Sequence, residues 1–203
     1  MEIKKITQYS PELTKQIAEI HIKTFKGFFL TFMGEGFLRQ MYKAYVFHQE
    51  SELLIASEDN KVVGFVAYTE NLSGLYKYMI KKQLIQFGWY SAGAFLRRPK
   101  VFMRLIRAFL KPSESKRTEK YAEITSIGVH PDVKGKGVGS KLISAVKEIF
   151  ASNDCEYLSL ETDTVNNEGA NAFYVKNGFV LVREYKTHEG RSMNEYRWSN
   201  RGE

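Results

Sequence analysis

The sequence predicts an α/β fold in which strands and helices alternate along one domain, residues 1–203. A strand-like run over 121–129 is followed directly by a glycine-rich loop and a helix over about 137–152. Two further strand-like runs, 53–57 and 62–69, are separated by four turn-forming residues, which is typical of a β-hairpin. With 203 residues, 43% of them hydrophobic and 14% aromatic, the chain can bury one substantial core.

The remaining elements follow from local signals. Residues 1–7 alternate weakly and predict an opening strand, and Ser10 followed by Pro11 is an N-cap and first-turn pair that starts a helix to about Phe25. An aromatic-rich helix is expected over about 34–47, before the hairpin. The expected order after residue 120 is strand, helix, strand, helix and two strands: 121–129, 137–152, 157–162, 167–176, 179–185 and 193–198.

A helical insert is predicted at about 72–118, between the third and fourth strands. Its apolar residues recur near helical spacing, and Arg98 followed by Pro99 predicts a break, because proline interrupts a helix. We therefore expect two or three short amphipathic helices, followed by a polar linker over 111–118.

The positive charge of the chain is concentrated in this insert. The formal net charge is +7, but the segment from Asn71 to Lys120 has twelve Lys or Arg and two acidic residues, which gives +10 and leaves about −3 for the rest. The insert is therefore expected to contact something anionic. Three readings remain open: a lid over an anionic sugar or nucleotide-linked acceptor, a membrane-surface patch for a lipid-linked acceptor, or a helical hairpin that forms a homodimer. Nucleic acid is an unlikely partner.

Several classes of chemistry are disfavoured by composition. The single cysteine, Cys155, cannot form an internal disulfide, and no spacing of His, Cys and carboxylate residues predicts a metal site. No run of 18 or more uncharged apolar residues occurs, and residues 1–7 lack a signal-peptide pattern, so a cytoplasmic protein is expected.

The loop after the run at 121–129 predicts an anion site. Free N–H groups and the positive end of a helix converge there, and glycines let a phosphate approach the backbone. The spacing fits neither a P-loop, because a lysine does not follow the last glycine, nor the G-x-G-x-x-G dinucleotide fingerprint. The residues concerned are Lys134, Gly135, Lys136, Gly137, Val138 and Gly139.

This loop resembles that of the GCN5-related N-acetyltransferase (GNAT) superfamily, with lysine in place of the usual arginine or glutamine at its first position. The later run is similar to the last helix and turn of that family, through Asn167, Ala170, Phe173, Tyr174 and Phe179. The resemblance is firm over 121–185, extends to 1–70 by element order, and does not cover the insert. It implies a mixed, mostly antiparallel sheet of about seven strands, splayed between the fourth and fifth strands and flanked by helices.

The resemblance also implies acyl-CoA dependent N-acyl transfer, with acetyl-CoA as cosubstrate, no metal, and a small-molecule primary amine such as an amino sugar as acceptor. Tyr174 would donate a proton to the thiolate and Glu123 would accept the amine proton. Glu161 and Asp163 share strand parity with Ser159 and could instead help orient the acceptor amine. Asn167 would contact pantetheine or act as an N-cap. The implied coenzyme site comprises Ile127, Val129, Lys134, Gly135, Lys136, Gly137, Val138, Gly139, Ser140 and Asn167.

Two alternatives stay open beside this function. One is a coenzyme A-binding or membrane-associated module that lacks turnover, and the other is O-acylation or a longer acyl donor. Strand alternation further predicts that Glu123, Thr125, Ile127 and Val129 share one face of their strand.

Overall fold

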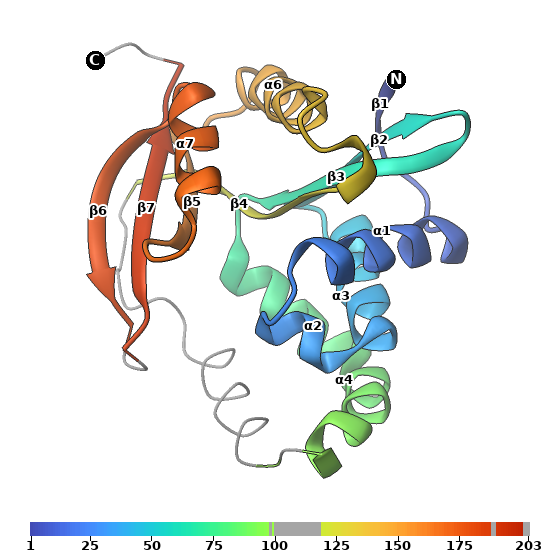
Figure 1. Cartoon of the computed structure of the whole chain (residues 1–203). Helices are drawn as coiled ribbons and strands as arrows, with labels where there is room; N and C mark the ends of the chain where they lie inside the picture. Colours follow the sequence, from blue (N-terminus) through green and yellow to red (C-terminus); the bar gives the residue numbers. More distant parts are fainter. Residues whose placement is uncertain (98, 100–118, 188–189, 201–203) are drawn as a thin grey trace.

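The structure is a computed structural model that describes residues 1–97, 99, 119–187 and 190–200. Seven strands form one sheet in the order β1-β2-β3-β4-β5-β7-β6 (Figure 1). The strands are β1 Glu2–Lys5, β2 Ser51–Glu58, β3 Lys61–Thr69, β4 Tyr121–Val129, β5 Tyr157–Asp163, β6 Val180–Lys186 and β7 Ser192–Trp198. The helices are α1 Pro11–Thr24, α2 Phe29–Met33, α3 Glu35–Phe47, α4 Leu72–Arg97, α6 Val138–Phe150 and α7 Glu168–Lys176, with a 3-10 turn η1 at Pro131–Val133.

The sheet is antiparallel except at one place, where β4 and β5 run parallel. Their pairing begins at Tyr121 and ends at Ile124 opposite Leu160, although β4 continues to Val129 and β5 continues to Asp163. The two strands therefore diverge beyond this point, and the splay expected between the fourth and fifth strands is confirmed.

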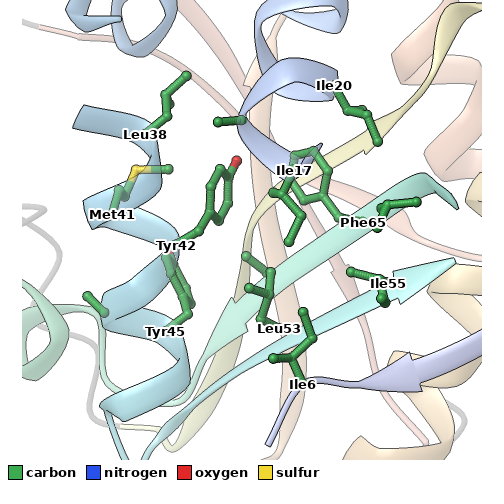
Figure 2. Close-up of a cluster of buried hydrophobic side chains, with 14 of the residues drawn as sticks. Ile6, Ile17, Ile20, Leu38, Met41, Tyr42, Tyr45, Leu53, Ile55 and Phe65 are labelled. Carbon is green, nitrogen blue, oxygen red and sulfur yellow. The ribbon is translucent and has the colours of Figure 1, made fainter. Parts of the chain in front are cut away.

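Helices cover both faces of the sheet, α1, α2, α3 and α4 on one side and α6 on the other (Figure 1). On the first face, Figure 2 shows side chains of α1 and α3 packed over β2 and β3: Ile17, Ile20, Leu38, Met41, Tyr42, Tyr45, Leu53, Ile55 and Phe65. On the second face, α6 and α7 pack against side chains of β2, β3, β4 and β5 that point away from the first core. The strands contribute Leu54, Val66, Ile124 and Leu158, and the helices contribute Leu142, Ile143, Val146, Phe150, Phe173 and Tyr174. Burying each large apolar side chain contributes about 1.5–3 kcal/mol, so two cores hold the sheet between two helical layers.

Local signals explain where several elements begin. The Ser10 hydroxyl accepts a hydrogen bond from Leu13 N–H at 3.3 Å, as expected of an N-cap. The β2–β3 hairpin turns at Asp59 and Asn60, both with positive φ, which is the conformation of a type I′ turn. The predicted hairpin is therefore confirmed, together with the residues that make its turn.

The predicted side-chain alternation along β4 holds for Glu123 and Thr125 and is wrong beyond Thr125. The register between β3 and β4 shifts by one residue, so Thr125 is an extra residue opposite β3, a β-bulge. Thr125 then faces α3, where the Tyr45 hydroxyl lies 2.6 Å from its own hydroxyl. After the bulge, Ile127 and Val129 pack on the α6 face instead. One bulge thus directs the two halves of β4 to opposite faces of the sheet.

The insert begins with one long helix, α4, rather than with short helices. Its first half packs against α3 through Leu75 and Met79, which are buried. The predicted break at Arg98–Pro99 and the linker at 111–118 fall in or beside residues that lie outside the described part of the chain. Within that part, no helix is both long and apolar enough to cross a membrane.

We expect Gly36→Ala to destabilise the contact between α3 and α4. A β-carbon at Gly36 would overlap the ring of Tyr90, so the tyrosine ring would have to move. Overpacking of this kind typically costs about 1–3 kcal/mol, measurable by urea unfolding.

The matched control is Gly169→Ala, because each glycine is the second residue of a helix and follows a glutamate. Nothing lies within 4 Å of a β-carbon at Gly169, so alanine should leave stability unchanged or raise it by up to about 1 kcal/mol. Equal effects of the two substitutions would contradict the packing of Tyr90 on α3.

Candidate active site

The N-terminus of α6 presents unpaired backbone donors. Gly137 has φ +79° at the N-cap and no side chain caps the helix. The first intrahelical hydrogen bond at this end joins Lys141 N–H to the Gly137 carbonyl at 3.1 Å, so the N–H groups of the first turn have no partner within the helix. Gly135 also has positive φ, +86°, which favours glycine because other residues are strained there. Free N–H groups at a helix N-terminus are suited to an anion, so the predicted site stays a prediction with compatible geometry.

This helix end lies against the end of β4. A β-carbon at Gly139 would be 3.1 Å from the ring of Phe173 and 3.7 Å from Cγ2 of Val129. The first turn of α6 therefore fits between α7 and the last residue of β4, and only a residue without a side chain fits there without displacing Phe173. An anion held at this turn would lie beside the splay.

The backbone of β4 offers hydrogen-bonding groups to the splay. His130 N–H donates to the Val63 carbonyl at 2.8 Å, on the β3 side. Because N–H groups alternate along a strand, those of Ile127 and Val129 point to the opposite side, where β5 has diverged. The Val129 carbonyl accepts a hydrogen bond from the Thr24 hydroxyl at 3.1 Å. The sequence-predicted residues Ile127 and Val129 therefore lie along the open edge.

Tyr174 lies on the α6 face of the sheet, among aromatic side chains. Its ring centroid is 5.3 Å from Phe173, 6.1 Å from Phe179 and 5.8 Å from Tyr196. Burial raises the pKa of Tyr174 to about 12, and Tyr196 adds to the rise. The phenol therefore stays protonated throughout the neutral range and can serve as a hydrogen-bond donor.

Glu123 lies on the other face of the sheet. Its neighbours Ala122 and Ile124 pack with α6, so Glu123 projects toward the helices α1, α3 and α4. Burial raises the pKa of Tyr45 above its ordinary value, and the nearby Glu123 carboxylate adds to the rise. Glu123 pairs with Ser159 of β5, one residue before the ladder ends. The two sequence-predicted catalytic residues, Glu123 and Tyr174, thus approach the splay from opposite faces.

Asn167 lies at the N-cap of α7, but its side chain does not cap the helix. The Asn167 amide donates to the Thr162 hydroxyl at 2.6 Å and to the Asp163 carbonyl at 3.2 Å, which ties α7 to the end of β5. Asn171, which the sequence analysis missed, donates to the same carbonyl at 3.1 Å and accepts from the Tyr196 hydroxyl at 2.9 Å. These two asparagines fix the helix that carries Tyr174; their spacing of four residues on one helix face was the available signal.

Further carboxylates share the face of Glu123. Glu161 accepts a hydrogen bond from the Tyr185 hydroxyl at 2.5 Å, and Asp163 forms a bidentate pair with Arg191 at 2.8 Å. Arg191 also lies 5.8 Å from the ring of Phe28, so the β6–β7 hairpin contacts the segment between α1 and α2. This contact lies on the same face of the sheet as Glu123.

His21 of α1 is a buried histidine. Its Nδ1 lies 2.6 Å from the Tyr42 hydroxyl, and Tyr42 in turn lies 3.3 Å from Ser126 of β4. Burial lowers the pKa of His21 to about 4, so the ring is neutral at physiological pH. Together with the Tyr45–Thr125 bond, this chain of contacts fastens α3 to the bulge in β4. Within the described residues, no group of three or more His, Cys, Asp or Glu could hold a metal ion.

A sheet splayed at one parallel strand pair, with free N–H groups of a helix end beside the gap, matches the GNAT acetyltransferase fold. The model of the acetyltransferase (GNAT) family matches residues 15–179, and the chain therefore belongs to that family. A search of curated proteins finds no match.

Solved structures agree with this fold. A GNAT-family protein from Desulfovibrio desulfuricans is 16% identical, with a TM-score of 0.64 over 98% of this chain and 99% of that one. An aminoglycoside 6′-N-acetyltransferase in complex with coenzyme A is 12% identical, with a TM-score of 0.65 over 98% and 97%. A Bacillus anthracis protein named as a streptothricin acetyltransferase, in complex with acetyl coenzyme A, is 18% identical, with a TM-score of 0.51 over 78% and 68%. At these identities the likeness establishes the fold.

We expect His21 to make the protein less stable in mild acid. In the unfolded chain His21 is protonated below about pH 6.5, whereas in the folded protein its pKa is about 4. The free energy of unfolding therefore falls as the pH is lowered from 6.5 toward 4. The loss between about pH 7 and pH 5 should be on the order of 2 kcal/mol in urea unfolding. His21→Gln should reduce this pH dependence, whereas His48→Gln, at a less buried site, should retain most of it. Equal pH dependence in both variants and the parent would exclude the assignment.

Proposed function

We propose that the protein transfers an acetyl group from acetyl-CoA to a primary amine of a small molecule, with Glu123 as base and Tyr174 as the group that assists the leaving thiolate. The observation that carries this proposal is the placement of these two side chains on opposite faces of the sheet, at its one splay. A thioester lying in the splay could be attacked from the Glu123 face while its sulfur lies toward the Tyr174 face.

On the donor side, the backbone amides from Gly135 to Ser140 would hold the pyrophosphate, and Lys134 and Lys136 add positive charge. The open edge at Ile127 and Val129 would pair with the pantetheine arm as an added strand would. An N–H at Val129 would polarise the thioester carbonyl, which gains negative charge as the amine adds. Binding along this edge supplies partners that β5 no longer provides.

On the acceptor side, Glu123 would remove a proton from the attacking amine, directly or through water. A carbon–nitrogen bond forms, the carbon–sulfur bond breaks, and the electron pair leaves with sulfur. Because the Tyr174 pKa is about 12 and that of a thiol is near 8.5, the phenol donates a hydrogen bond to the thiolate more readily than its whole proton. The thiolate can then take its final proton from solvent.

Cationic acceptors suit the carboxylates on this face, Glu123, Glu161 and Asp163, which would attract an ammonium group. Two structural relatives carry names of enzymes that act on aminoglycosides and streptothricin, which favours amino sugars and related amines.

A second candidate follows from the basic insert: a lipid-linked or anionic acceptor, or a coenzyme A-binding module without turnover. Screening amino sugars, polyamines, amino acids and peptides for thiol release from acetyl-CoA would separate these.

Tyr174→Phe is expected to lower kcat by about 10²-fold or more while leaving coenzyme A affinity unchanged. The aromatic ring remains, and only the hydroxyl that donates a hydrogen bond to the thiolate is lost. Thiol release and isothermal titration with coenzyme A measure the two quantities. The control is Tyr9→Phe, at a tyrosine that contacts Lys43 and Phe47 away from the splay. Unchanged turnover in Tyr174→Phe would rule out its role at the sulfur.

Glu123→Gln is expected to lower kcat by about 10²–10⁴-fold near neutral pH, since the amine loses its proton acceptor. The deficit should shrink as the pH rises toward the pKa of the amine, because the unprotonated amine then needs no base. Measuring kcat against pH for both forms gives the comparison. A constant deficit at all pH values would assign Glu123 to binding instead.

A further inference from the structure

One face of helix α4 is buried against the rest of the protein. Leu75, Met79, Gln83 and Ser91 are 0–4% exposed, at the four- and eight-residue spacing of one helix stripe. The ring of Phe87 packs against Phe37 of α3, with the ring centroids 4.8 Å apart and the planes tilted, which holds the middle of the helix in place. The helix is therefore anchored along its length rather than projecting freely.

The outward face of α4 is also apolar. Ile85, Trp89 and Leu96 are 84%, 80% and 79% exposed. At about 100° per residue these three lie within about 40° of one another and well over 90° from the middle of the buried stripe. A surface helix normally carries polar residues there, so this outward stripe departs from the usual pattern.

Charge of one sign accompanies the outward stripe. Lys81 and Lys82 fall on its two flanks, one turn before Ile85, and Lys77 precedes them. Leu72–Arg97 contains no Asp or Glu, and the sequence from Asn71 to Lys120 carries +10. Residues 83–96 are free of charge, a length too short to span a bilayer but suited to lying at its surface.

We propose that this stripe docks the protein on an anionic lipid bilayer. Ile85, Trp89 and Leu96 would enter the boundary between headgroups and acyl chains, and the lysines would pair with anionic headgroups. Tryptophan prefers this interfacial depth, because its ring is apolar and its N–H remains near water. The helix lies on the membrane and does not cross it.

A bilayer fits the stripe better than a second copy of the chain does. Two copies joined through α4 would bring together helices that have lysines and no carboxylates, so like charges would repel across the contact. Anionic headgroups complement that charge instead. The exposed apolar side chains of α4 also lie on a single convex helix, which suits insertion into a fluid interface more than a rigid dimer.

Docking in this way would turn the helical layer toward the membrane. Helices α1 to α4 cover the same face of the sheet as Glu123, whereas α6 lies on the opposite face (Figure 1). The acceptor side would then face the lipid and the anion-binding helix end would face water. The docking surface stands apart from the proposed catalysis, since none of its residues belongs to the site.

The test is cosedimentation of the full chain with phosphatidylcholine vesicles, with and without phosphatidylserine. We expect binding to the anionic vesicles at low salt, weakening at about 0.5 M salt, where charges are screened beyond a few ångströms. The double variant Ile85→Glu with Trp89→Glu should lose ~10-fold or more of this affinity, since two apolar side chains no longer enter the lipid. In a Trp198→Phe background, brominated lipid should quench the fluorescence of Trp89.

Two controls separate docking from general effects. Val175→Glu and Val180→Glu place the same charge at residues that are each 57% exposed on α7 and β6, and should leave vesicle binding unchanged. Lys15→Gln, on α1, should weaken binding less than Lys81→Gln does. Acetyl-CoA turnover on a soluble amine should persist in the α4 variants, which keeps this test independent of the proposed function.

Three results would overturn the proposal: no binding to anionic vesicles, equal loss in the control variants, or no quenching of Trp89 in bound protein. A fourth is a dimer in sedimentation equilibrium that the double variant dissociates while vesicle binding is absent. That outcome would make the stripe an interface between copies.

Discussion

The ladder between β4 and β5 ends while both strands continue, and this interruption governs how the molecule is built. Backbone N–H and C=O groups inside a protein must find partners, so an opened strand edge is costly unless something supplies them. Beyond Ile124, the β5 side of β4 has no strand partner, and the first turn of α6 also presents free donors nearby. The unpaired edge of β4 and the free N–H groups of α6 lie close together, and one extended anionic ligand could hydrogen-bond to both.

The bulge in β4 is the second device on which this region depends. Before Thr125 the strand sends Glu123 toward the helical layer, and after it Ile127 and Val129 face α6. Two tyrosines of α3 hold the bulge, Tyr45 at Thr125 and Tyr42 at Ser126. A bulge normally weakens a sheet locally, so these side-chain contacts replace part of what the ladder loses. The first helical layer thus maintains the geometry of the splay.

The sequence predicted what depends on local spacing. The turn at Asp59 and Asn60, the positive φ of the glycines at 135 and 137, and the order of the strands all follow from short-range chemistry, and the structure agrees. The short helix α2, Phe29–Met33, was not predicted. The bulge at Thr125 was missed because an extra residue in a strand leaves no mark on composition and inverts every later side chain. The continuity of α4 was missed for another reason: its apolar residues occupy two faces, which blurs the period that marks an amphipathic helix. The roles of Glu123 and Tyr174 remain proposals.

If acetyl-CoA and the amine approach the splay from opposite faces of the sheet, as proposed, the two substrates reach the site by separate routes. If the proposed chemistry holds, neither substrate needs to leave before the other arrives, and neither product blocks the path of its partner. Kinetically this corresponds to a sequential mechanism through a ternary complex, without an acyl-enzyme intermediate. Coenzyme A would then compete with acetyl-CoA alone, and the acylated product with the amine alone. The order of addition is thereby set by the relative concentrations of the two substrates rather than by the shape of the site.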